Sequence, residues 1–483
     1  MLTQGDFINI EKQAVALYES LELEIIEEIA TRIAKVGYAN TVVLNDIQIA
    51  QEMGALYTDI ISLVAKYNNT SYEKVAKIFE EAGAKTLSRD DFIYKEAGLN
   101  PVPIKQSRPI MQTTSATIEK TTGNLQNLVM TTANTAQTQF YNAMNMAYME
   151  ITTGVKSYSQ SILDAIDNIS SKGVSIMYPS GHKMSLESAV RMNIITGVNQ
   201  TCGKLQELRA DEVGCDLMEI TAHSGARPSH MSWQGKIVSR SGKKGYLSLQ
   251  DIGYGTTTGF KGVNCRHDWY PYYEGSARTY TQEQLNDWKN EKVIYNGNEY
   301  SKYDATQIQR RMERQIRADK KELAGLQGIL TSANDNKLIE DTRTEFSKRS
   351  LLYKTHQNEL NHFIEQTSFV KDNTRLYVGK QDKNISTQVA NVTKIANKYN
   401  NSNIVGSKVN GIKVTGIGEH IISRTYARNV SFEDVQDTLK NPIKYGKIRT
   451  NKTQQINGKN CTIIINTETG KLVTVYPKKT KKD

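Results

Sequence analysis

The sequence AHSGARPSHMSWQG occupies residues 222–235, and GVNCRHDWYP follows it at residues 262–271. Strand-forming residues precede the first block at 217–222, and glycine and aromatic residues are frequent from 225 to 275. Short strands separated by turns have this kind of composition. The two blocks therefore predict a compact α+β module over residues 171–280.

Four side chains of the two blocks are of types that bind zinc: His223, His230, Cys265 and His267. Imidazole nitrogen and thiolate sulfur are common zinc ligands, so one hypothesis is a structural zinc ion that joins two loops. The alternative is a buried polar network in which the histidines bind loop carbonyl groups and Cys265 packs as a small apolar residue. The spacing matches no standard zinc finger. Neither block contains an evident general base, and Asp268 alone does not indicate catalysis.

Helical periodicity dominates the chain before the module. Apolar residues recur every three to four positions over 7–36 and over 45–67, and each range predicts a helix. A further helix should begin at Ser71, a favourable N-cap, and end near Gly83. Residues 111–170 keep the same spacing despite many threonines, which predicts one or two long helices.

Helices are also expected inside the module and after it. Ser185 is a favourable N-cap for a helix through about Ala210. Residues 304–330 and 335–366 are strongly charged and helical in pattern, and the break between them predicts an antiparallel hairpin or coiled coil. Residues 371–410 are polar and rich in Asn and Lys, which is typical of a linker.

The last part of the chain has the pattern of a small α+β domain. Its second helix has a capping-box-like start, with Ser431 followed by acidic residues. Asn457-Gly458 predicts a type I′ hairpin turn, and residues 468–470 predict a second turn. The expected helices are 419–428 and 431–439, and the expected antiparallel strands are 443–450, 460–466 and 472–476.

These patterns predict a mainly α fold with α+β modules. The expected parts are a helical region at 1–170, a compact α+β core at 171–280, a helical hairpin at 281–370, a linker at 371–410 and a small α+β domain with an antiparallel sheet at 411–483.

Positive charge is concentrated at the end of the chain. The net charge is +10, and residues 440–483 contain eleven Lys or Arg against two acids, a surplus of nine. An acidic partner, most simply nucleic acid, should therefore meet this domain.

Four scattered cysteines without CxxC spacing fit a reducing compartment. We expect a soluble protein made in a cytosol, because we find neither a signal peptide nor an apolar run of about 20 residues.

One face of the last domain has the residue types that cleave RNA without metal. His420, Arg424 and Arg428 are four residues apart on one helix, and Thr474 and Tyr476 share a face of the last strand. A histidine can act as base or acid near neutral pH, and cations can stabilise the extra phosphate charge. The phosphate backbone would be bound by basic residues, namely Lys444, Lys447, Arg449 and Lys452. The alternative is a nucleic-acid-binding module in which His420 only caps or packs.

The two central blocks resemble those of phage minor capsid proteins of the MuF-like head-morphogenesis group. The flanking stretches 185–212 and 303–317 fit the same group, and the resemblance covers about residues 1–370. It implies a virion protein of the phage head, made in the bacterial host cytoplasm and present in a few copies near the portal vertex. Portal and capsid proteins would be its partners, and its roles would be head assembly and DNA packaging or ejection.

The C-terminal domain is similar to small nuclease-like domains of the barnase, EndoU, colicin D and RelE type that are fused behind phage minor capsid proteins. The shared features are a helical histidine followed by arginine, an Asn-Pro pair and a terminal strand with threonine, within residues 411–480. The resemblance implies a metal-independent ribonuclease toxin with no required cofactor. The domain has only one histidine, which departs from a two-histidine acid–base mechanism. Active ribonuclease and passive binder both stay open.

Overall fold

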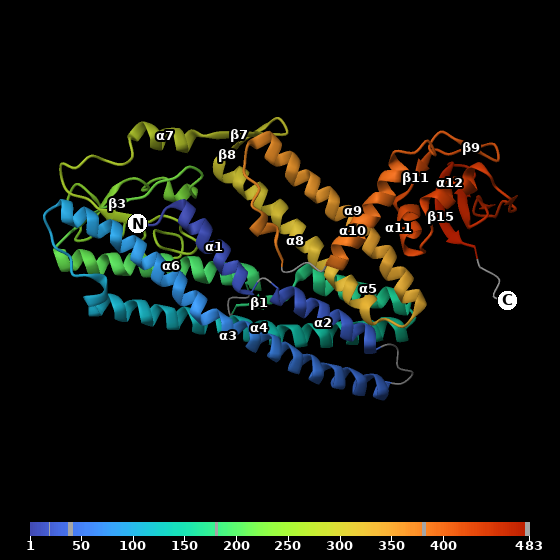
Figure 1. Ribbon diagram of the computed structural model, residues 1–483, viewed down its shortest axis with the longest axis horizontal. Coiled ribbons are helices and arrows are strands. Elements are labelled where there is room, and N and C mark those ends of the chain that lie inside the picture. Colours follow the sequence, from blue (N-terminus) through green and yellow to red (C-terminus); the bar gives the residue numbers. More distant parts are fainter. Residues whose placement is uncertain (19, 37–41, 179–181, 379–382, 479–483) are drawn as a thin grey trace.

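A computed structural model describes residues 1–18, 20–36, 42–178, 182–378 and 383–478. This part of the chain is mainly helical with small sheets, which confirms the predicted fold class (Figure 1). The helices are α1 (Gln4–Tyr18), α2 (Leu21–Val36), α3 (Val42–Glu96), α4 (Arg108–Thr152), α5 (Tyr158–Lys172), α6 (Leu186–Val213), α7 (Gln282–Asn290), α8 (Lys302–Ser332), α9 (Asn336–Thr367), α10 (Lys383–Asn400), α11 (Glu419–Ala427) and α12 (Phe432–Lys440).

The strands are short and fall into small sheets. They are β1 (Ser175–Met177), β2 (Lys183–Ser185), β3 (Leu217–Ile220), β4 (Ile237–Ser239), β5 (Leu247–Ser248), β6 (Trp269–Pro271), β7 (Lys292–Tyr295), β8 (Asn298–Ser301), β9 (Lys408–Val409), β10 (Ile412–Lys413), β11 (Gly416–Ile417), β12 (Lys444–Tyr445), β13 (Thr453–Asn457), β14 (Cys461–Asn466) and β15 (Lys471–Pro477). Three short 3-10 turns are η1 (Ile104–Gln106), η2 (Pro228–His230) and η3 (Asn373–Leu376).

The N-terminal helices differ from the expected ones at their boundaries. Residues 7–36 form two helices, α1 and α2, and the separate helices expected at 45–67 and 71–83 are one helix, α3. Ser71 does not act as an N-cap, because its hydroxyl donates to the carbonyl of Asn68 one turn earlier in the same helix. Gly83 does not end the helix, since it faces Leu205 of α6 and its missing side chain allows the two helices to approach closely.

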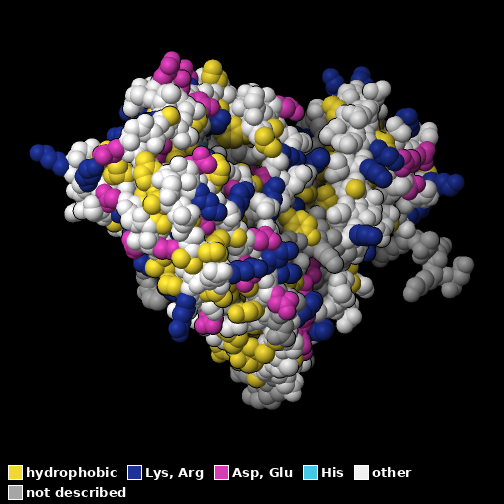
Figure 2. Space-filling view, turned by 60° about the vertical axis from the view of Figure 1, so that its left-hand side comes forward, with side chains coloured by type: hydrophobic (Ala, Val, Ile, Leu, Met, Phe, Trp, Pro, Cys, Tyr) yellow, Lys and Arg dark blue, Asp and Glu magenta, His cyan; other side chains and the backbone are white. Residues whose placement is uncertain are grey.

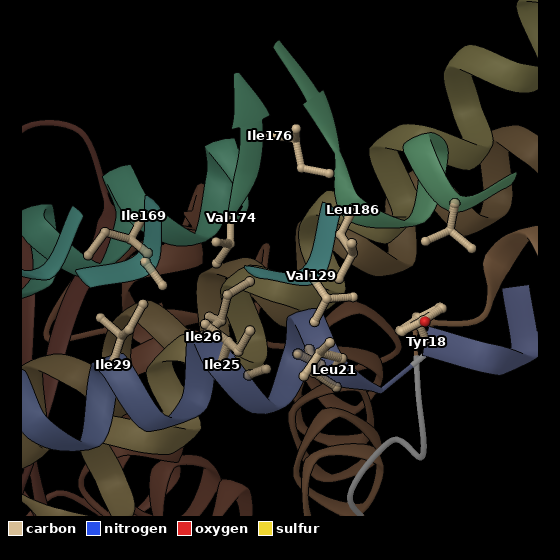
Figure 3. Close-up of a cluster of buried hydrophobic side chains, with 14 of the residues drawn as sticks. Tyr18, Leu21, Ile25, Ile26, Ile29, Val129, Ile169, Val174, Ile176 and Leu186 are labelled. Atoms are coloured by element: carbon tan, nitrogen blue, oxygen red, sulfur yellow. The ribbon is translucent and has the colours of Figure 1, made fainter. Parts of the chain in front are cut away.

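The largest core lies where α2 packs against α3, α4, α5 and α8. Figure 3 shows Ile29 of α2 opposite Ile169 of α5, Ile25 of α2 below Val174, and Leu21 of α2 beside Val129 of α4. A spacing of four residues places the three α2 side chains on one stripe of the helix. Each fully buried aliphatic side chain contributes about 1.5–3 kcal/mol, so this stripe holds α2 in the body of the molecule.

The central module is a four-stranded sheet in the order β5-β4-β3-β6, with long loops on either side of it. β3 pairs antiparallel with β4 and with β6, and β4 pairs parallel with β5. Aromatic side chains form its core, with the ring of Trp269 stacked on Tyr254 and tilted against Phe260. The sheet is small, so loops and their aromatic residues supply much of the packing.

The predicted helical hairpin is present as α8 and α9, and side-chain caps explain where both helices begin. The Ser301 hydroxyl accepts from the amide of Asp304 at 3.0 Å, and the Asp335 carboxylate accepts from the amide of Leu338 at 2.6 Å. The loop between the two helices is short, which makes them antiparallel neighbours in the fold.

The segment expected to be a linker, residues 371–410, is instead largely ordered as η3 and α10. Ile385 and Val389 of α10 join the main core, whereas Ala396 and Tyr399 join the core of the C-terminal domain. The linker prediction rested on the polar composition of the segment and did not take into account that its few apolar residues have helical spacing. α10 therefore connects the two cores.

The C-terminal domain has a five-stranded mixed sheet in the order β11-β15-β14-β13-β12. The predicted sheet was antiparallel with three strands, but β11 pairs parallel with β15, and β13 was missed. Both predicted helices are present, and Ser431 caps α12 by accepting from the amide of Asp434 at 3.0 Å.

The turn at the end of β13 is not the predicted type I′ turn. A type I′ turn requires positive φ at both central residues, and neither Asn457 nor Gly458 has it. Gly458 is required for another reason, since any side chain there would overlap Thr438 of α12. The second predicted turn is confirmed, with Gly470 at φ +68° between β14 and β15.

Candidate metal centre and nucleic-acid interface

Three of the four predicted zinc ligands meet inside the central module. His230 ends η2, and Cys265 and His267 lie on the loop before β6. Nδ1 of His230 lies 3.3 Å from Nδ1 of His267, and Sγ of Cys265 lies 3.8 Å from that same Nδ1 of His267. All three side chains are buried, and their ligand atoms lie within 4.8 Å of one another.

Hydrogen bonds on the far side of each ring define the proton positions of this cluster. Nε2 of His230 lies 2.9 Å from the carbonyl oxygen of Thr258, and Nε2 of His267 lies 3.1 Å from Oε1 of Gln234. The same Gln234 oxygen accepts from the amide of His223, so it is the amide oxygen that faces both partners. Oxygen acceptors at both Nε2 atoms place the hydrogens there and leave a lone pair on each Nδ1.

Burial keeps both rings neutral. It lowers the pKa of His230 to about 4 and the pKa of His267 well below its ordinary value. Burial also raises the pKa of the Cys265 thiol. In the protein alone, the cluster is therefore a thiol and two neutral imidazoles.

His223, the fourth predicted ligand, lies beside the cluster. Its ring stacks on His267 with centroids 4.5 Å apart, and its Nδ1 lies 3.0 Å from the carbonyl oxygen of Ser224. Its Nε2 is buried and has no hydrogen-bond partner among the described residues. The alternative of a polar network also has support, because Arg227 donates to the carbonyl of Val263 at 3.2 Å.

A buried ion pair next to this cluster was missed by sequence reasoning. Nζ of Lys261 lies 2.6 Å from Oδ1 of Asp268, and both side chains are almost wholly inaccessible. Lys261 also donates to Asn199 at 2.8 Å, while Asp268 accepts from the backbone amides of Leu2 and Trp269. Asp268 is thus a structural charge that connects the N-terminal segment to the module. Nothing in the local pattern indicates that a lysine in a glycine-rich loop is buried.

A second buried charge connects the module to the helical body. Glu11 of α1 forms ion pairs with Arg191 of α6, with Arg266 of the second block and with Arg375 of η3. Burial by itself would raise the pKa of Glu11, but these arginines together lower it. Arg266 therefore has a structural partner 255 positions away along the chain.

The C-terminal candidate residues are partly brought together. Arg428, at the end of α11, donates to Oγ1 of Thr474 at 3.2 Å and to the carbonyl of Val475 at 2.5 Å. Its guanidinium lies 3.9 Å from the ring centroid of Tyr476. The predicted shared face of Thr474 and Tyr476 is thus the surface on which Arg428 lies.

The two arginines of this face are already paired with an acid from another part of the chain. Oε1 of Glu340, on α9, lies 2.6 Å from Arg424 and 2.9 Å from Arg428. We call this arrangement the Glu340 clamp. His420 is exposed on the first turn of α11, and its pKa is lowered by partial burial and by Arg424, Lys348 and Arg428.

The other predicted cations lie on a different part of the domain and are exposed. They are Lys444, Lys447, Arg449 and Lys452, on β12 and the loop to β13. Lys452 lies 3.5 Å from Glu468, and both side chains are mostly exposed, whereas the other three form no ion pair with any described residue. Figure 2 shows Lys and Arg side chains spread over the lobe at the right of the view, with few acids among them. We call these four residues the basic edge.

Comparison with known proteins identifies the larger part of the chain. The family of phage minor capsid protein 2 matches residues 2–365. The chain belongs to this family. The match covers the helical body, the central module and nearly all of the helical hairpin, and it ends before α10.

Two phage proteins resemble this minor capsid protein. A structural protein of Lactococcus phage LL-H is 29% identical over 281 residues, which cover 55% of this chain and 73% of the relative. A structural protein of Lactococcus phage mv4 is 29% identical over 140 residues, which cover 29% of this chain and 94% of the relative. No solved structure matches the chain.

These findings confirm the predicted resemblance to phage minor capsid proteins and make the protein a virion component. In the described part of the chain, no helix of this minor capsid protein has the length and apolar character of a membrane span.

Proposed function

We propose that this minor capsid protein lies near the portal vertex of the phage head and binds packaged nucleic acid through its C-terminal domain. The helical body and the central module make the protein–protein contacts of the head. The basic edge contacts phosphates of the genome. The two roles are assigned to different parts of the chain and are compatible.

The exposure of the basic edge is the observation that carries the nucleic-acid role. Lys444, Lys447 and Arg449 have no acidic partner among the described residues, whereas Arg424 and Arg428 are paired with Glu340, and Arg424 also with the neighbouring Asp341. Exposed cations displace condensed counterions from a phosphate backbone, and this release supplies most of sequence-independent binding. Phosphate contacts of this kind need no particular base sequence, which suits a packaged genome.

Neutralising the basic edge should weaken binding and flatten its salt dependence. Each lost phosphate contact reduces the slope of log K against log salt by about 0.9 for duplex DNA, so replacing all four cations with Gln should reduce it by about 3 to 4. Fluorescence anisotropy with a DNA duplex, measured on the full chain from 50 to 200 mM salt, gives this slope.

A matched control removes four exposed lysines elsewhere on the surface. Its changes are Lys77→Gln, Lys105→Gln, Lys120→Gln and Lys244→Gln. The control should keep the wild-type slope to within about one unit. Equal slopes for the wild type and the basic-edge variant would refute the nucleic-acid role.

The position near the portal is supported by membership of the minor capsid family over residues 2–365 and by similarity to phage structural proteins. Chemical cross-linking of intact virions with mass spectrometry should link lysines of this region to the portal protein. Cross-links to the major capsid protein alone would contradict this position.

A second candidate function is ribonuclease activity at the Glu340 clamp. It is favoured by the convergence of Arg428, Thr474 and Tyr476 on one side of the sheet, with His420 and Arg424 on the adjoining helix. In this conformation a carboxylate binds the cations that would otherwise bind a phosphate. Cleavage would therefore require that α9 and the C-terminal domain separate at Glu340.

A further inference from the structure

We infer that His230, Cys265 and His267 form a binding site for one divalent metal ion of the zinc type. The ligand atoms are Nδ1 of each histidine and Sγ of the cysteine. The site is buried in the central module and is independent of the nucleic-acid role proposed for the C-terminal domain.

The two Nδ1 atoms are the first argument for a cation. Both carry lone pairs, because both Nε2 atoms donate to oxygen acceptors, and the two lone-pair atoms lie 3.3 Å apart. Two acceptors at this distance repel each other unless a proton or a metal ion lies between them. A proton there would create an imidazolium ion between two buried side chains, and taking such a charge out of water is costly. A metal ion removes the conflict.

The spacing of the ligand atoms is the second argument. Bonds of about 2.0–2.1 Å to nitrogen and about 2.3 Å to sulfur, at tetrahedral angles, separate two nitrogens by about 3.3 Å and a nitrogen from a sulfur by about 3.6 Å. The structure has 3.3 Å between the nitrogens and 3.8 Å between Cys265 Sγ and His267 Nδ1. Two of the three distances are thus close to those of a zinc coordination shell, and all three ligand atoms lie within 4.8 Å of one another.

The outer hydrogen bonds are the third argument. Histidines that bind metals donate their other ring nitrogen to a carbonyl or carboxylate oxygen, which orients the ring and fixes the tautomer. His230 does so to Thr258, and His267 does so to Gln234. The fourth position of the tetrahedron is left for a water molecule or for Nε2 of His223, which is buried beside the cluster without a partner among the described residues.

The location of the site indicates what the ion would do. His230 belongs to the loop after β3, and Cys265 and His267 belong to the loop before β6. The strands of this module contain only two to four residues each, so the loops need a further link to keep one conformation. A metal ion between them would hold the two sequence blocks together.

Metal analysis of the full, tag-free chain tests the inference. After expression with zinc in the medium and purification without chelators, we expect about one zinc ion per chain. Replacement by cobalt should give the visible bands of a tetrahedral site together with thiolate-to-cobalt charge transfer. Cys265→Ser should abolish the charge-transfer band. His267→Gln should weaken binding by more than about 100-fold, because loss of an outer partner alone weakens it by 10- to 100-fold.

Cys461→Ser is the matched control, since Cys461 is an equally buried free cysteine in the C-terminal domain. It should keep the metal content and the cobalt spectrum of the wild type. A zinc content below one-tenth per chain in the folded wild type would overturn the inference. So would a charge-transfer band that survives Cys265→Ser. The zinc content and the cobalt spectrum of the wild type test the inference even if a variant fails to fold, and circular dichroism identifies such a variant.

Discussion

Replacing Lys261 with Met should lower the free energy of unfolding by about 3–5 kcal/mol, the usual cost of breaking a buried ion pair on one side. Lys261 and Asp268 are almost wholly inaccessible, and their charged atoms lie 2.6 Å apart. Met fills the space of the lysine stem, so packing changes little. The loss arises because the Asp268 carboxylate stays buried without its cation. Urea unfolding followed by circular dichroism measures the change.

Two further variants isolate the electrostatic cause. Lys204→Met breaks an exposed pair with Glu207 on α6 and should cost less than about 1 kcal/mol. Adding Asp268→Asn to Lys261→Met removes the unpaired charge and keeps one side-chain oxygen. That oxygen can accept from only one of the two amides that the carboxylate binds, Leu2 at Oδ2 and Trp269 at Oδ1, so only part of the stability should return. If Lys261→Met lost no more unfolding free energy than Lys204→Met, the Lys261–Asp268 ion pair would not be buried in solution.

Replacing Glu340 with Ala should make nucleic-acid binding more strongly salt dependent. The variant releases Arg428 fully and leaves Arg424 with only its 3.5 Å contact to Asp341, so one to two additional phosphate contacts should steepen the slope of log K against log salt by about 1 to 2. The anisotropy assay used for the basic edge measures this directly. Glu359→Ala is the matched control, because Glu359 is exposed on the same helix, α9, and forms no ion pair with any described residue. An unchanged slope would mean that the two arginines do not reach the ligand.

The same variants decide between binding and cleavage. Full-length wild type, Glu340→Ala and Glu340→Ala/His420→Ala are incubated with transfer RNA without added divalent metal. A ribonuclease that is blocked by the clamp cleaves faster in Glu340→Ala and loses this activity when His420 is also replaced. Intact RNA in all three incubations would eliminate the ribonuclease candidate and leave binding as the role of the domain.

Local signals in the sequence were sufficient for much of the secondary structure. Ser185, Asp335 and Ser431 were predicted to begin helices or to lie at a helix start, and each accepts a backbone hydrogen bond as an N-cap. A cap depends on atoms within one turn of the residue, so sequence alone can locate it. Ser71 looks the same in sequence, but it lies inside α3 because contacts with α6 and the main core continue the helix past it.

The candidate sites also combine features that the sequence predicts with features that only tertiary contacts decide. The residue types of the metal cluster and the concentration of positive charge at the end of the chain were readable from the sequence, because they depend only on composition and on short motifs. Only the tertiary structure placed Nδ1 of His230 against Nδ1 of His267 and set Glu340 against arginines more than 80 positions away. Ring orientation and ion pairing depend on atoms contributed by distant segments. No local pattern encodes where those segments meet, since packing of the whole chain decides it.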